Sequence, residues 1–123
     1  MNAFEVGQKL VELCKQGKNQ EAMETLYGQD IVSVEAAEMP GLPRELRGYQ
    51  AVAGKGKWWY ENHTIHSIEI EGPWPHGDRF LVRFKYDVTN KPSNQRMQLD
   101  EMGLFTVANG KVVREEFFYP TGP

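Results

Sequence analysis

Three glutamates lie in segments with the alternating or β-branched pattern of strands: Glu35, Glu101 and Glu115. A carboxylate that faces an apolar interior loses hydration, so its pKa rises and it can act as a general acid or base near neutral pH. Groups of this kind carry out proton abstraction, cyclisation or hydration of small organic molecules. The plainer alternative is a solvated glutamate at a strand end or in a surface ion pair, which contributes little to stability.

The strand register decides which acids point inward, because side chains alternate along a strand. Glu101 falls on the more apolar face of the predicted strand 97–107, together with Leu99, Gly103, Phe105 and Val107. A slip of one residue would turn Asp100 inward instead. We favour Glu101, and we expect Gly103 beside it to leave room for a ligand or a close backbone approach.

The last predicted strand, 111–119, has two mixed faces. One face carries Val113, Glu115, Phe117 and Tyr119, and the other carries Val112, Arg114, Glu116 and Phe118. The pattern alone therefore separates Glu115 from Glu116 only weakly.

One lysine could balance these acids. Lys55 shares a helix face with Val52, Trp59 and His63, at spacings of three and four residues. Three carboxylates cannot all ionise in one small pocket without a cation, which an inward Lys55, Arg83 or the ligand itself could supply. A helix-surface lysine is the commoner case.

Aromatic side chains provide candidate pocket walls. The predicted ligand-binding set is Lys55, Trp59, His63, Phe105, Phe117 and Tyr119. Such walls suit a small hydrophobic or aromatic molecule, although the same rings could simply fill a core.

Composition excludes several classes of function. The 123 residues carry a net charge of −3, and the basic residues are scattered, so nucleic acid is not an expected partner. The single cysteine, Cys14, allows neither an intrachain disulfide nor a thiolate cluster, and the three histidines lack metal-ligand spacing. No apolar run is long enough to span a bilayer, and no signal sequence is recognisable. We expect a cytoplasmic protein without metal, cofactor or membrane partner.

The pattern of elements predicts one α+β domain over residues 1–123. Apolar spacing predicts a helix that Gly17 ends, a short helix over 19–27 that Gly28 ends, and a third helix opened by Gly48. Strands are predicted at 31–35, 65–71, 79–89, 97–107 and 111–119, and a loop at 39–43. Helices followed by hairpin-connected strands indicate a strongly curved, cone-shaped antiparallel sheet wrapped around three N-terminal helices.

This order of elements resembles the nuclear-transport-factor-2-like superfamily, and most closely its SnoaL-like group. The resemblance rests on Ala22–Tyr27 before the first strand, on Gly48, and on the hairpin Leu104–Val113. It implies a cystatin-like α+β roll. Members include ketosteroid isomerases, polyketide cyclases, limonene-epoxide hydrolases and binding-only domains, so the fold alone does not fix the function.

The resemblance also bears on single positions. Glu35 falls where ketosteroid isomerases carry their general-base aspartate, and the family register favours Glu115 as inward. Leu10 and Gly103 stand where those isomerases carry oxyanion donors, so steroid isomerisation by the known arrangement is not expected. Lys85 and Asp87 are similar to the Arg–Asp pair of epoxide hydrolases. Their alternation, however, places them opposite the apolar face of their strand.

The sequence thus favours acid–base chemistry with Glu35 as base and Glu101 or Glu115 as acid. The alternatives are a non-catalytic pocket for a small ligand and a dimeric assembly module. The mixed, aromatic outer faces of the last strands favour a homodimer.

Overall fold

The computed structural model of the protein describes residues 1–38 and 41–121. Three helices and six strands follow one another as α1 (Ala3–Lys15), α2 (Asn19–Leu26), β1 (Tyr27–Val34), β2 (Glu45–Arg47), α3 (Tyr49–Glu61), β3 (His63–His76), β4 (Arg79–Asn90), β5 (Gln95–Ala108) and β6 (Lys111–Phe118). Met39 and Pro40, within the predicted loop, lie outside the described residues.

Helix α1 begins at a capping box. The Asn2 side chain accepts a hydrogen bond from the Glu5 amide, and the Glu5 carboxylate accepts one from the Asn2 amide. The apolar stripe of α1 is buried, and it includes Val6, Leu10 and Cys14. Helix α1 therefore packs along the inner face of the sheet.

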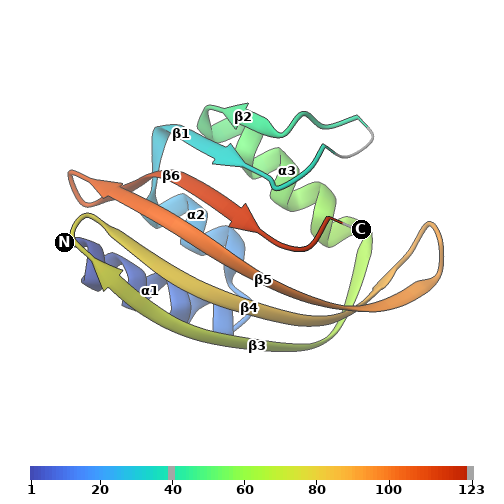
Figure 1. The fold of residues 1–123 in the computed structure, drawn as a ribbon. Helices are drawn as coiled ribbons and strands as arrows, with labels where there is room; N and C mark the ends of the chain where they lie inside the picture. Colours follow the sequence, from blue (N-terminus) through green and yellow to red (C-terminus); the bar gives the residue numbers. More distant parts are fainter. Residues whose placement is uncertain (39–40, 122–123) are drawn as a thin grey trace.

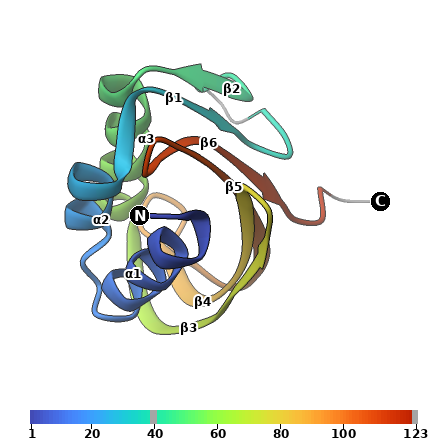
Figure 2. The ribbon, with the colours of Figure 1, turned by 90° about the vertical axis from the view of Figure 1, so that its left-hand side faces the viewer.

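All six strands form one curved sheet in the order β2-β1-β6-β5-β4-β3. The sheet bends around the helices, which all lie on its inner side (Figures 1 and 2). The inner side chains of β4 build much of the core: Phe80, Val82, Phe84, Tyr86 and Val88. The predicted curved α+β fold is confirmed.

The sheet differs from the prediction in one pairing. Strands β1 and β6 run parallel, whereas the other neighbours are antiparallel, so the sheet is mixed. Local patterns cannot reveal this pairing, because its two strands are separated by most of the chain. The short strand β2 was also not predicted.

The start of β1 was assigned wrongly. Tyr27 was predicted to end the second helix and Gly28 to stop it, but α2 ends at Leu26 and β1 begins at Tyr27. The pairing of Tyr27 with Val112 of β6 overrides the helical pattern. Consequently the Tyr27 side chain is buried on the inner side of the sheet.

Candidate functional site

A buried carboxylate lies at the centre of the polar residues inside the sheet. Glu115 of β6 is only 4% exposed. Its carboxylate accepts hydrogen bonds from the Tyr27 hydroxyl and, at 2.6 Å, from Ser33 Oγ. Burial raises the pKa of Glu115, while the charge of Lys55 and the two hydroxyl donors oppose that rise. Strand β1 supplies both donors because it lies directly beside β6.

Lys55 of α3 points into this group rather than into solvent. Its side chain is 9% exposed, and Nζ donates to Ser33 Oγ at 2.5 Å and to Glu35 Oε1 at 3.0 Å. Nζ also lies 5.6 Å from the centre of the Phe117 ring, within the range of a cation–π contact. The ammonium is thus the cation that the neighbouring carboxylates require.

The chain of hydrogen bonds continues to the segment after β6. The Tyr119 hydroxyl donates to Glu35 Oε2 at 3.1 Å. Burial, the charge of Glu35 and this hydrogen bond raise the pKa of Tyr119 to about 12. Six side chains are therefore connected in the order Tyr119, Glu35, Lys55, Ser33, Glu115 and Tyr27. We call these six hydrogen-bonded side chains the polar chain.

Glu101 lies on the inner face of β5, on the same face as the buried Gly103 and Phe105. Asp100 points outward, where it forms a bidentate ion pair with Arg83 at 2.9 and 2.6 Å. Burial raises the pKa of Glu101 to about 7, with a further contribution from the charge of Glu35. Among the described residues, no hydrogen bond is made to its carboxyl group.

The register of β6 contains an irregularity that the sequence does not reveal. Thr106 pairs with Arg114 and Val107 pairs with Val112, so Val113 is an extra, bulged residue. Val112 is therefore buried, whereas Val113 was predicted to share the face of Glu115. Beyond the bulge, Glu115 is buried and Glu116 forms an ion pair with Arg114 at 3.5 Å.

Aromatic rings enclose the polar chain on the β4–β5 side. Phe105 is 1% exposed and meets Phe117 edge to face, with ring centres 6.1 Å apart. A Cβ at Gly103 would lie 2.8 Å from Phe105 Cε1 and 3.2 Å from Phe117 Cε1. The space expected beside Gly103 for a ligand is thus occupied by these two rings.

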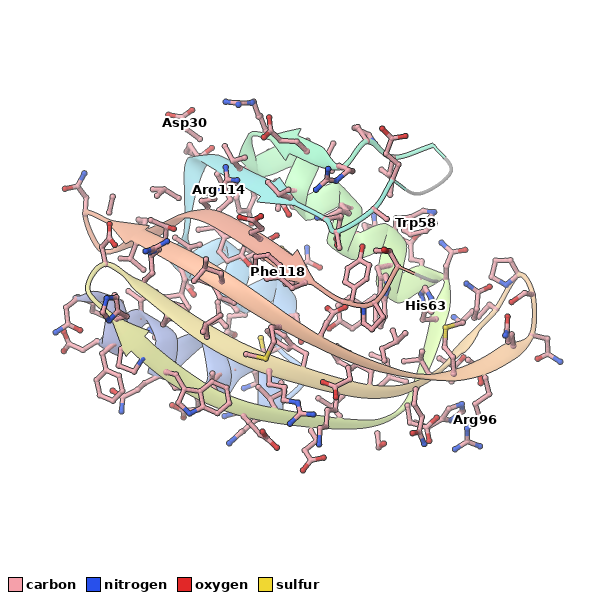
Figure 3. All side chains as sticks on the ribbon, viewed as in Figure 1. Asp30, Trp58, His63, Arg96, Arg114 and Phe118 are labelled. Atoms are coloured by element: carbon pink, nitrogen blue, oxygen red, sulfur yellow. The ribbon has the colours of Figure 1, made fainter. Side chains whose placement is uncertain are left out.

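Two of the predicted ligand-binding residues, Trp59 and His63, lie apart from the polar chain. Trp59 stacks on His63 with ring centres 4.3 Å apart, and it also meets Tyr86 at 5.5 Å. His63 Nδ1 lies 2.7 Å from the Trp59 carbonyl oxygen. His63 is found where α3 meets β3 (Figure 3), so these rings line the far end of the interior.

Two hollows on the surface contain none of the predicted site residues. One, of about 290 Å³, lies between α2 and α3 and is lined by residues such as Met23, Gly56 and Tyr60. The other, of about 370 Å³, lies between α1 and the Gly72–Pro73 segment of β3. The polar chain is therefore not part of either hollow.

Comparison with known proteins places this fold in a family. The profile of the SnoaL-like domain matches residues 1–119. The chain belongs to the SnoaL-like domain family. A structure from Mesorhizobium loti, described as a proposed SnoaL-like polyketide cyclase with "carbohydrate phosphatase" in brackets, is 44% identical at a TM-score of 0.88. The match covers 94% of this chain and 97% of that one.

Two more distant structures share the fold of this SnoaL-like domain. A protein of unknown function with a cystatin-like fold from Xanthomonas campestris is 13% identical, with a TM-score of 0.79 over 97% of this chain and 91% of that one. A hypothetical protein with a ketosteroid isomerase-like fold from Catenulispora acidiphila, solved with trimethylamine, is 16% identical, with a TM-score of 0.70 over 98% of this chain and 88% of that one. No curated protein matches the chain. The predicted resemblance to the SnoaL-like group is confirmed.

Three family positions outside the polar chain have plain structural roles in this SnoaL-like domain. Leu10 is 2% exposed and belongs to the core. Lys85 and Asp87 point outward: Lys85 Nζ lies 4.0 Å from Glu71 Oε1, and Asp87 pairs with Arg96 at 2.8 Å. These two side chains therefore belong to the charged outer face and not to the interior.

Sequence reasoning missed two members of the polar chain, Tyr27 and Ser33. Ser33 could have been found, because it alternates with Ile31 and Glu35 and is therefore on the same strand face as the predicted base. Tyr27 could not, since its local pattern is helical. In residues 1–38 and 41–121 no cluster of three or more potential metal ligands occurs, and no helix is long and apolar enough to cross a membrane.

Proposed function

We propose that this SnoaL-like domain catalyses proton transfer on a small organic molecule, in an isomerisation, cyclisation or hydration. The observation that carries the proposal is Glu101, a partly buried carboxyl group on the inner face of β5 with a pKa of about 7 and no hydrogen bond from any described side chain. Such a group takes up and releases a proton at neutral pH without first breaking an existing interaction. Glu101 is therefore our candidate for the proton-carrying residue.

The other acids receive different roles from their contacts. Glu35 is held by Lys55 and Tyr119, so we assign it to fixing these two donors rather than to moving a proton. The Lys55 ammonium would stabilise negative charge that develops on a substrate oxygen. Glu115 is fully enclosed behind its two hydroxyl donors, and we assign it a positioning role.

The aromatic residues are proposed as substrate contacts. Phe117 and Tyr119, which are partly exposed, would face the substrate, and the core ring of Phe105 supports Phe117 from behind. Trp59 and His63 would contact the more distant part of a longer, flat molecule. A small hydrophobic or aromatic substrate fits these walls.

The experiment is deuterium exchange at carbon positions next to a carbonyl group. A panel of aryl ketones in D₂O is followed by NMR with the wild-type protein and the Glu101→Gln and Asp100→Asn variants. We expect catalysed exchange on at least one ketone, a loss of about 100-fold or more in Glu101→Gln, and no loss in Asp100→Asn. Equal exchange in wild type and Glu101→Gln, or none with any ketone, would refute proton transfer by Glu101.

A binding-only role for small organic cations is the second candidate. Three carboxylates share the interior with one lysine, and the rings of Phe105 and Phe117 are nearby. A protonated amine would compensate the charge and meet aromatic faces. The similar protein from Catenulispora acidiphila was solved with trimethylamine. Binding of choline but not of the neutral isostere 3,3-dimethylbutan-1-ol, without any deuterium exchange, would favour this role.

We also propose a homodimer through the outer face of the sheet. Five apolar side chains from adjacent strands face outward there: Trp74, Leu81, Met102, Leu104 and Phe118. Trp74 and Phe118 are each 47% exposed, and Phe118 lies at the front of the sheet in Figure 3. An apolar patch of this kind on a charged surface is typical of an interface, and a two-fold pair covers it with itself.

Light scattering after size exclusion tests the dimer. We expect a dimer for the wild type, a monomer for Phe118→Ser, and a dimer for the control Trp58→Ser, because Trp58 is 40% exposed on α3 and away from the patch. A monomeric wild type would contradict the proposal.

A cytoplasmic location completes the proposal. The single cysteine, Cys14, is buried and not part of a disulfide, which suits a reducing compartment. Fractionation of cells that express the tagged protein would test the location, and recovery outside the cytoplasm would refute it.

A further inference from the structure

The buried serine of β1 makes two short hydrogen bonds. Ser33 is fully buried, and its Oγ lies 2.6 Å from Glu115 Oε2 and 2.5 Å from Lys55 Nζ. A hydroxyl has one proton to donate, and an ammonium has no acceptor. The directions are therefore fixed: Lys55 donates to Ser33, and Ser33 donates to Glu115.

Strand pairing holds this serine rigidly. Ser33 pairs with Glu115 in the parallel β1–β6 ladder and with Leu46 of β2 on its other side. Its backbone is thus fixed from both directions, and the Glu115 carboxylate fixes the rotation of its hydroxyl. Ser33 Oγ is consequently a stationary acceptor.

Lys55, by contrast, needs anchors. A lysine has a flexible four-carbon stem and an ammonium without a preferred direction. Here two acceptors hold it, Ser33 Oγ at 2.5 Å and Glu35 Oε1 at 3.0 Å. Without Ser33 Oγ, the ammonium would keep only the Glu35 carboxylate, which lies nearer the surface.

We propose that Ser33 is a positioning residue that acts through Lys55, by holding the ammonium at the place where its charge favours ionisation of Glu101. This inference rests on the proposed role of Glu101 as proton carrier. Ser33 is too deeply buried to contact a substrate. Its effect is therefore on the charge of the site and not on binding.

Several titratable groups surround Glu101 and define its environment. They include Glu35 just after β1, Lys55 and Tyr60 from α3, Tyr86 from β4, Glu115 from β6, and Tyr119 beyond β6, with Cys14 of α1 next to Tyr60, Tyr86 and Glu115. Burial raises the pKa values of the three tyrosines, which stay neutral between pH 5 and 9. Lys55 is the one group in this set that lowers the pKa of Glu101.

The test is a double-mutant cycle read by NMR titration of the Glu101 carboxyl carbon. We expect Lys55→Met to raise the Glu101 midpoint by about 1 pH unit or more, and Ser33→Ala to raise it by about 0.5 to 1 pH unit. If Ser33 acts through Lys55, the double variant should match Lys55→Met alone. Ser67→Ala, a strand serine that faces solvent, is the matched control and should leave the midpoint unchanged.

Two results would overturn the inference: an unchanged midpoint in a folded Ser33→Ala protein, or shifts of Ser33→Ala and Lys55→Met that add. Should Ser33→Ala unfold, Ser33→Cys is the substitute, because it keeps a similar volume with a weaker acceptor. Ser33→Cys should raise the Glu101 midpoint by a smaller amount, and an unchanged midpoint in this variant would also overturn the inference. The titration needs no substrate. Failure of the deuterium exchange would therefore refute the proposed function while leaving the titration readable, and an unaltered midpoint with intact exchange would refute only the role of Ser33.

Discussion

Replacing Glu101 by glutamine should change how the stability of the protein depends on pH. Glutamine keeps the shape of the side chain and removes its titration. In the wild type, burial and the charge of Glu35 move the pKa of Glu101 from 4.5 to about 7 in the folded state. The unfolded chain keeps the ordinary value, so folding and protonation of this one group are linked.

The sign and size follow from that linkage. Below pH 4.5 the carboxyl is protonated in both states, whereas between pH 4.5 and about 7 the folded state binds more protons than the unfolded chain. Stability therefore falls as the pH rises through this window and levels off above it. At about 1.4 kcal/mol per pH unit, the loss amounts to about 3 kcal/mol.

Urea unfolding at a series of pH values between 4.5 and 8 measures this effect. The free energy of unfolding of Glu101→Gln minus that of the wild type should increase by about 3 kcal/mol across the series. Glu115 is present in both proteins, so its own titration largely cancels in the difference. Asp100→Asn is the control: its ion pair with Arg83 lowers the pKa of Asp100, so its difference should stay flat above pH 5. A flat difference for Glu101→Gln as well would refute the assignment of a partly buried acid with a raised pKa.

Two further comparisons use matched positions and the same unfolding assay. Glu115→Ala leaves the buried Tyr27 hydroxyl without its acceptor and should lower the free energy of unfolding by about 3 kcal/mol. Glu116→Ala on the outer face should lower it by less than about 0.5 kcal/mol. Equal losses for the two variants would contradict the buried role of Glu115. Gly103→Ala drives a methyl group into packed aromatic rings and should cost about 1–3 kcal/mol, while Gly54→Ala, with open space around it in α3, should stabilise by up to about 1 kcal/mol. A tolerated Gly103→Ala would mean that the rings beside it move freely.

The inward position of Glu101 could be predicted because it depends on a local rule. Side chains alternate along β5, and the apolar residues on one face identify the inner side. The same rule did not work in β6, where the bulge at Val113 shifts the alternation by one residue before Glu115. A bulge depends on how two strands pair, so it cannot be predicted from the sequence of one strand alone.

Three helices, the four hairpin-connected strands and the family could be predicted from the sequence, since they depend on periodicity, caps and turn residues within short windows. The parallel pairing of β1 with β6 and the direction of the Lys55 side chain depend on contacts between distant parts of the chain. On a helix, a lysine can have the same sequence spacing from the apolar residues whether it faces solvent or a buried serine. The difference lies in partners 20 and 22 residues away, and these reach Lys55 only because α3 packs against β1.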